Sequence, residues 1–386
     1  MRVLLHVGMP KAGSTALQQA LAGGRDRLGR QGILYPRAPL FPDSQNFLVA
    51  GVEERRHALP RMIRSAYDGR MDEIGPAFTR WMADIRASIA ATRPETMVLS
   101  SEWLFGLRGQ QKFDRLAELL RGFGGPFEVV AYVRRPADQY LSAVQQTLKG
   151  SHAIRPVTAV RYRTPLEGFA RVADAVRVVR YDRAAFPGGD IVRDFLEAFL
   201  PGADLAANPG GNTANATISA EGMAILAGYR RANHRKSRGR FTPDTDRLIA
   251  AIRDADAAVG GTIRPNLRPE VASAVDAASN DVLWLRDTYG IVFDGLDYDR
   301  VADAPATKAD LDEGKDEPAR LDRKAAKAAK ARPKQIEEIC IVDPDRHHEL
   351  LMRTLHGLAS AGRAAPPTSW RGVSLWLRGR EVRGRR

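Results

Sequence analysis

Short apolar runs alternate with stretches of helical periodicity along the first two hundred residues. Four short runs predict strands, at residues 3–7, 97–100, 128–133 and 176–181, and the first two are predicted to be buried. Apolar positions recur at helical spacing between and after these runs, over residues 14–21, 72–92, 113–123, 137–148 and 191–199. Alternating strands and helices of this kind predict an α/β fold in which a parallel sheet is covered by helices on both faces.

The pattern changes in the C-terminal part of the chain. Residues 217–300 are predicted to be mostly helical, whereas residues 303–334 are rich in Ala, Lys, Asp and Glu. We therefore expect one α/β domain over residues 1–302, a charged low-complexity linker over 303–335, and a small extension with a basic tail over 336–386. Because the linker is poor in large apolar side chains, a chain ending near Ala302 is expected to fold by itself.

Positive charge is concentrated near the C-terminus. The chain of 386 residues has a formal net charge of +13, and residues 321–386 hold 15 Lys and Arg against 7 Asp and Glu, which is +8. This tail predicts an anionic partner such as a membrane surface rather than a specific nucleic acid. The one cysteine, Cys340, excludes an intrachain disulfide, and no apolar run approaches transmembrane length. We expect a cytoplasmic protein, with peripheral attachment at the inner face of the membrane compatible with the tail.

A glycine-containing turn joins the first predicted strand to the first predicted helix. Gly8 and Gly13 have the spacing of a P-loop, but Ser14 stands where a P-loop has its lysine, and the lysine of this chain lies inside the turn at Lys11. A strand, a glycine turn and a helix together present free backbone N–H groups and a helix dipole to an anion. The sequence therefore predicts a P-loop-type sheet with an anion-binding loop at its first strand, although a plain strand-to-helix turn with a surface lysine remains the alternative.

Two further groups follow predicted strands. Glu102 comes after the strand at 97–100, and Arg134 ends the strand at 128–133, with Ser142 eight residues later in the next helix. Ligands of open parallel sheets bind beyond the carboxyl ends of the strands, so Lys11, Glu102 and Arg134 are expected to converge. A guanidinium and a hydroxyl suit a terminal phosphate. The alternatives are a helix-capping role for Glu102 and a surface position for Arg134.

The loop and the arginine segment together resemble PAPS-dependent sulfotransferases. The run Pro10, Lys11, Ala12, Gly13, Ser14 and Thr15 is similar to the loop with which that family binds the 5′-phosphosulfate of 3′-phosphoadenylyl sulfate (PAPS). The spacing of Arg134 and Ser142 resembles the family's 3′-phosphate site. The similarity covers about residues 1–295 and is greatest to bacterial members thought to act on glycans or lipid-linked sugars.

The resemblance implies roles for these residues. Residues 10–15, Arg134 and Ser142 would bind PAPS, Lys11 would stabilise the leaving group, and Glu102 would be the catalytic base. His6 and His152 are the competing bases. PAPS would be the sulfuryl donor, no metal is required, and the acceptor would be a hydroxyl or amine of a glycan or lipid-linked sugar.

Two other functions remain open from the sequence. A P-loop kinase would also use an anion loop, but the lysine is displaced and no convincing Mg²⁺-binding aspartate follows a strand. A protein that binds nucleic acid or an anionic surface through the basic tail would show salt-sensitive binding without sequence preference.

Overall fold

The computed structural model describes residues 1–205, 217–236, 239–260, 264–302 and 333–360. The chain forms two compact units, which we describe separately. The sheet unit comprises Met1–Arg135, Arg161–Gly211 and Asp281–Gly295. The helical unit comprises Pro136–Val160, Asn212–Asn280 and Leu296–Arg386. Each unit is therefore built from three separate segments of the chain.

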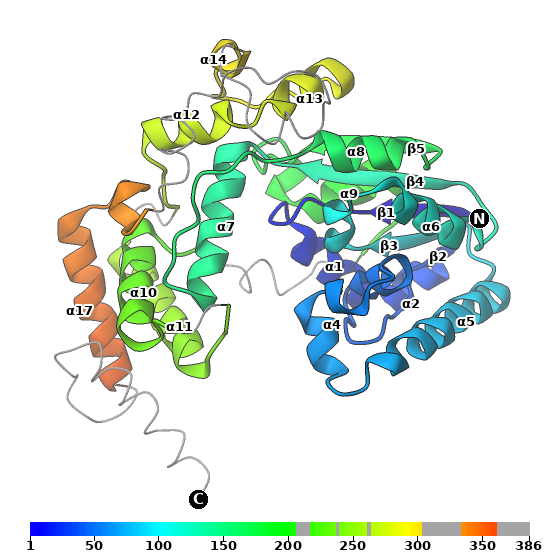
Figure 1. The fold of residues 1–386 in the computed structure, drawn as a ribbon, viewed down its shortest axis with the longest axis horizontal. Coiled ribbons are helices and arrows are strands. Elements are labelled where there is room, and N and C mark those ends of the chain that lie inside the picture. Colours follow the sequence, from blue (N-terminus) through cyan, green and yellow to red (C-terminus); the bar gives the residue numbers. More distant parts are fainter. Residues whose placement is uncertain (206–216, 237–238, 261–263, 303–332, 361–386) are drawn as a thin grey trace, which may run out of the picture. The chain divides into compact units, whose positions relative to one another are not determined.

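The sheet unit contains one parallel sheet of five strands in the order β2-β3-β1-β4-β5 (Figure 1). The strands are β1 (Arg2–His6), β2 (Ile33–Leu34), β3 (Thr96–Ser100), β4 (Phe127–Val133) and β5 (Ala175–Arg180). β1 is central, and its Leu5 lies opposite Leu99 of β3 and Val129 of β4, all three fully buried. The predicted α/β class is confirmed. β1, β3 and β4 are buried on both faces and read as continuous apolar runs, which is why the sequence located them. The predicted strand at 176–181 corresponds to β5, an edge strand in which no residue is fully buried, and the two-residue β2 was not among the predicted strands.

Helices cover both faces of this sheet. In one group, α1 (Ser14–Gly23) packs against α2 (Arg25–Arg30) and α9 (Ile191–Phe199). The other group is α3 (Val49–Val52), α5 (Ile74–Thr92), α6 (Gln110–Arg121) and α8 (Arg163–Ala170). From β1 the chain first crosses to β2 at one edge of the sheet, and it then runs back across the sheet to β3, β4 and β5. Crossovers between parallel strands are right-handed, so connections that run in opposite directions along a sheet place their helices on opposite faces.

Shorter elements complete the sheet unit. They are η1 (Asn46–Leu48), η2 (Arg56–Ala58), α4 (Arg61–Ala66), η3 (Met71–Glu73), η4 (Glu102–Gly106), η5 (Pro187–Gly189) and α13 (Asp281–Tyr289). Of these, η4 positions Glu102, one of the residues that the sequence singles out.

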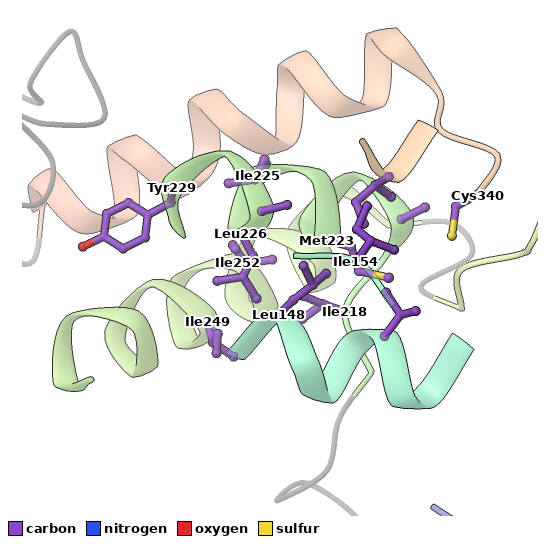
Figure 2. Packing of buried hydrophobic residues seen from close by; sticks show 14 of the residues in the cluster. Leu148, Ile154, Ile218, Met223, Ile225, Leu226, Tyr229, Ile249, Ile252 and Cys340 are labelled. Atoms are coloured by element: carbon purple, nitrogen blue, oxygen red, sulfur yellow. The ribbon is translucent and has the colours of Figure 1, made fainter. Parts of the chain in front are cut away.

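The helical unit has its own apolar core. Its elements are α7 (Pro136–Gly150), α10 (Ala220–Asn233), α11 (Pro243–Val259), α12 (Pro269–Ala277), α14 (Tyr298–Ala302), η7 (Ile336–Glu338) and α17 (Pro344–Ser360). Figure 2 shows side chains such as Leu148, Met223 and Ile252 meeting between α7, α10 and α11, with α17 lying across them. The predicted helical C-terminal part is confirmed.

The C-terminal segment belongs to this core and is not a separate extension. Ile336 and Leu350 are at most 1 % exposed and pack with residues of α10 and α11. The Arg346 guanidinium lies 3.4 Å from Glu221 Oε2 and 3.2 Å from Asp256 Oδ1, with all three side chains largely buried. The expected boundary at residue 302 is therefore corrected, because residues 336–358 supply apolar side chains that the helical unit needs.

The remaining C-terminal predictions lie outside the described residues. Most of the predicted linker falls in residues 303–332 and the basic tail in 361–386. In the described part of the chain, no helix combines the length and apolar character that spanning a membrane requires.

A chain ending at Ala302 is expected to be insoluble, or to melt many degrees below the full chain. The truncation removes buried side chains of η7 and α17 and leaves Glu221 and Asp256 without Arg346, and an uncompensated buried charge is costly. A melting curve of the truncated chain, measured beside the full chain and a chain ending at Ser360, tests this. Equal melting temperatures for all three would restore the boundary at 302.

Candidate active site

The loop after β1 is held between its two neighbouring strands. Val7 donates its backbone N–H to Val130 O (2.9 Å) and Met9 donates to Tyr132 O (3.1 Å), so the chain stays beside β4 beyond the end of β1. The turn then closes through Ala12 N–H to Met9 O (3.0 Å), and α1 begins at Ser14. The predicted strand, turn and helix are therefore present, with the turn at the carboxyl end of the central strand.

Three loop residues have positive φ angles. They are Gly8 (22°), Lys11 (74°) and Gly13 (80°). A Cβ on Gly13 would come within 2.7 Å of Tyr181 and Ile191, so close packing as well as backbone angle requires glycine there. Lys11 has no such freedom, and its left-handed conformation costs about 1–2 kcal/mol. Backbone strain of this kind clusters at functional sites.

The N-terminus of α1 is open. In the described part of the chain no side chain caps it, and its first turn holds no acidic residue. Pro10 and Thr15 are exposed, Lys11 is partly buried, and Ala12 and Ser14 are buried. Uncapped N–H groups and the positive end of a helix dipole favour an anion at this position.

Glu102 faces this loop from the next strand. The Ser101 N–H donates to His6 O (2.9 Å) and Ser101 Oγ donates to Asn46 Oδ1 (2.9 Å), which fixes the start of η4 at the end of β1. Burial raises the pKa of the Glu102 carboxyl above its ordinary value, while the Lys11 ammonium and the Ser14 hydroxyl oppose that rise. Burial also lowers the pKa of Lys11, and Glu102 opposes that change. The predicted acid and cation are thus electrostatic partners in a partly dehydrated site.

Arg134 also reaches the loop. Its Nη1 donates to Lys11 O (3.3 Å), although the two residues are 123 positions apart in the sequence. The guanidinium carbon lies 5.7 Å from the centre of the Tyr181 ring, and the Arg134 carbonyl accepts a hydrogen bond from Tyr162 Oη (2.6 Å). The expected convergence of Lys11, Glu102 and Arg134 at one edge of the sheet is present in the structure.

The other predicted groups lie in the helical unit. Ser142 is half-buried on α7, and His152 follows that helix. The pairing of Ser142 with Arg134 and the role of His152 as an alternative base therefore stay predictions.

A buried polar network lies behind the loop, and its members Ser100, Gln18 and Gln45 had no role in the sequence analysis. Ser100 Oγ lies 2.8 Å from His6 Nδ1 and accepts a hydrogen bond from Gln18 Nε2 (3.1 Å). Gln45 Oε1 accepts from the Ser100 N–H (2.6 Å). The only signal in the sequence was a polar residue ending an otherwise apolar strand. Tyr181, at the loop, likewise had no assigned role.

A surface hollow of about 390 Å³ lies elsewhere on the sheet unit. It is lined by α2, β2 and α5, including Arg25, Tyr35 and Trp81. None of the predicted loop residues lines this hollow. In the described residues, no group of three or more His, Cys, Asp or Glu side chains is arranged to hold a metal ion.

Comparisons with family models, with curated proteins and with solved structures find no match to this chain.

Replacing Lys11 with Ala is expected to raise the pKa of Glu102 further, because the carboxylate loses the cation that opposes the effect of burial. The measurement is a carboxyl ¹³C titration by NMR, with the Glu102 signal identified from Glu102→Gln.

Lys112→Ala is the matched control. Burial raises the pKa of Glu53, but the Lys112 ammonium and the Arg55 N–H hold it below its ordinary value. Lys112→Ala should therefore raise the pKa of Glu53 and leave Glu102 unchanged. An unchanged pKa of Glu102 in Lys11→Ala would show that the two groups do not interact electrostatically.

Proposed function

We propose that this chain is a PAPS-dependent sulfotransferase. The observation that carries the proposal is the meeting of an uncapped helix N-terminus, Lys11 and Arg134 at one strained loop, with the Glu102 carboxylate beside it. Cations and N–H donors suit the phosphates of a nucleotide, and the carboxylate suits the hydroxyl that attacks. The resemblance of residues 10–15 and of Arg134 to the family's motifs supports the same conclusion.

The residues present fit a phosphosulfate group. Lys11 and the first N–H groups of α1 supply positive potential, and the buried Ser14 Oγ has no hydrogen bond of standard geometry within the described residues. Arg134 adds a planar guanidinium, which can form two parallel hydrogen bonds to a terminal phosphate. Ser142 would be its hydroxyl partner. Bound PAPS supplies the sulfuryl group.

Lys11 and Glu102 would divide the chemistry between them. Glu102 would accept the proton of the acceptor hydroxyl, since a carboxyl whose pKa is raised by burial is a better base than an exposed one. Lys11 would stabilise the negative charge that develops on the phosphate oxygen released from the sulfur. Both effects are stronger in a partly dehydrated site, where charges interact more strongly than in water. The proton thus moves to Glu102, a sulfur–oxygen bond forms to the acceptor, and the bond to the phosphate breaks.

The acceptor and the location of the protein rest on the sequence. A hydroxyl or amine of a glycan or lipid-linked sugar is the proposed acceptor, as the resemblance to bacterial sulfotransferases implies. A cytoplasmic site, with the basic tail at the anionic inner face of the membrane, would bring the enzyme to lipid-linked substrates.

Calorimetry with PAP, the desulfated product, distinguishes the sulfotransferase from a kinase. The native chain is expected to bind PAP tightly without magnesium, and ATP weakly. In Arg134→Ala, PAP binding should weaken by about 2–4 kcal/mol, since a charge-assisted contact is lost. Adenosine 5′-phosphosulfate, which lacks the 3′-phosphate, should bind both proteins equally. Tight magnesium-dependent ATP binding without PAP binding would instead identify a kinase-like enzyme, and equal losses for both ligands would remove Arg134 from the 3′-phosphate.

Lys11→Ala is expected to lower turnover by roughly 10²-fold or more, as for the loss of a donor that acts in the transition state. The fold should persist, because Lys11 lies in a turn and Ala keeps the Cβ, so the cost of the left-handed backbone is the same in the variant. The assay follows PAP release from PAPS with and without a sugar acceptor, and melting curves report folding. Lys112→Ala, which removes a lysine paired with Glu53 on another part of the sheet unit, serves as the control. A Lys11→Ala protein with near-normal turnover would refute the assigned role.

A further inference from the structure

Two buried polar atoms lie close to Gly8 of the loop. His6 Nε2 and Ser14 Oγ are both buried, and neither meets a hydrogen-bond partner of standard geometry in the described residues. A Cβ built on Gly8 would lie 2.7 Å from each of them. Because both atoms are that close to one point, their separation is at most twice that distance. A hydrogen bond between them requires this separation to be about 3 Å, the distance that the proposal below assigns to them.

The contact on the opposite side of the His6 ring allows the proton to lie on Nε2. Ser100 Oγ accepts a hydrogen bond from Gln18 Nε2 and lies 2.8 Å from His6 Nδ1. An amide nitrogen can only donate, so the Ser100 hydroxyl proton is available for His6 Nδ1. Burial lowers the pKa of His6 to about 3, which keeps the ring neutral at physiological pH. A neutral ring that accepts at Nδ1 carries its proton on Nε2.

The ring is held so that Nε2 keeps this direction. The His6 side chain is fully buried, and its ring packs edge-on against Tyr132 and Phe195, with centroids 6.0 and 5.9 Å away. Tyr132 is itself fixed by a hydrogen bond from its Oη to Asp194 Oδ2 (2.5 Å). A ring flip would place Cδ2 where Nδ1 lies and Cε1 where Nε2 lies, and the Ser100 contact would be lost.

Ser14 can accept a hydrogen bond without losing its role as a donor. Its hydroxyl opposes the rise in the pKa of Glu102, as a donor to the carboxylate would. The lone pairs of Ser14 Oγ are then free for His6. The interaction with Glu102 is weaker than a hydrogen bond of standard geometry, so an anion in the loop could accept the Ser14 hydroxyl proton instead.

We propose that His6 is a positioning residue for Ser14, whose hydroxyl it directs toward the anion that the loop binds. His6 Nε2–H donates to Ser14 Oγ, and the Ser14 hydroxyl proton then points to Glu102 in the free protein and to a phosphosulfate oxygen in the complex. The relay runs from Gln18 through Ser100 and His6 to Ser14. The inference rests on the proposed function for the identity of the anion, but the hydrogen bond itself does not.

Two substitutions of His6 separate its nitrogens. The amide nitrogen of His6→Gln stands near the position of Nε2, whereas that of His6→Asn stands near Nδ1. We expect His6→Asn to weaken the binding of PAP and of pyrophosphate about 10-fold, which is the effect of losing one hydrogen bond to a polar partner. His6→Gln should bind both ligands with most of the affinity of the native chain. In a Ser14→Ala background, His6→Asn should add less than about 2-fold, because coupled residues are not additive. Melting curves identify any variant that fails to fold.

An NMR measurement on the full chain tests the hydrogen bond without a nucleotide. The ¹⁵N spectrum of His6, identified by its loss in His6→Asn, should show the Nε2-protonated form, and Ser14→Ala should shift that signal. An Nδ1-protonated ring would overturn the proposal, as would equal effects of His6→Asn with and without Ser14. If pyrophosphate shows the coupling but PAP does not bind, the inference stands and the proposed function fails.

Discussion

The backbone of β1 determines where everything else in the sheet unit can act. As the central strand, it is hydrogen-bonded on both sides, and this pairing continues past its end, with Met9 bonded to Tyr132 on one side and Ser101 bonded to His6 on the other. The loop, the start of η4 and the end of β4 are therefore held at one edge of the sheet. The parallel arrangement makes this possible, since all carboxyl ends lie at the same edge.

Burial then decides the chemistry of the groups collected there. Desolvation disfavours the charged forms of both Lys11 and Glu102, and each stabilises the charge of the other. A pair of this kind is a poor source of stability, because dehydration offsets much of the attraction. It is well suited to a site in which an arriving anion competes with the carboxylate for the ammonium. In the proposed enzyme, the same anion that binds Lys11 would release Glu102 to act as a base.

The helical unit shows how a core can draw on distant parts of the chain. α7 follows β4 directly, while η7 and α17 come after residue 332, yet their apolar side chains pack into one cluster. Arg346 completes it by facing the carboxylates of Glu221 and Asp256. Large apolar residues in a C-terminal segment are thus core residues here, even though a charged stretch separates them from the rest of the chain.

The sequence alone determined the class of the fold and located four of the five strands of the sheet, because the strands buried on both faces are continuous apolar runs and the helices between them carry a 3.6-residue period. It also located the loop, since Gly8 and Gly13 mark positions where a side chain does not fit. Tertiary structure decided the rest. Residues far apart in the chain are joined by three kinds of contact: the hydrogen bond between Arg134 and Lys11, the network of Ser100 and Gln18, and the packing of Leu350. Short-range periodicity carries no information about such contacts, because they depend on strand order and on which helix faces meet.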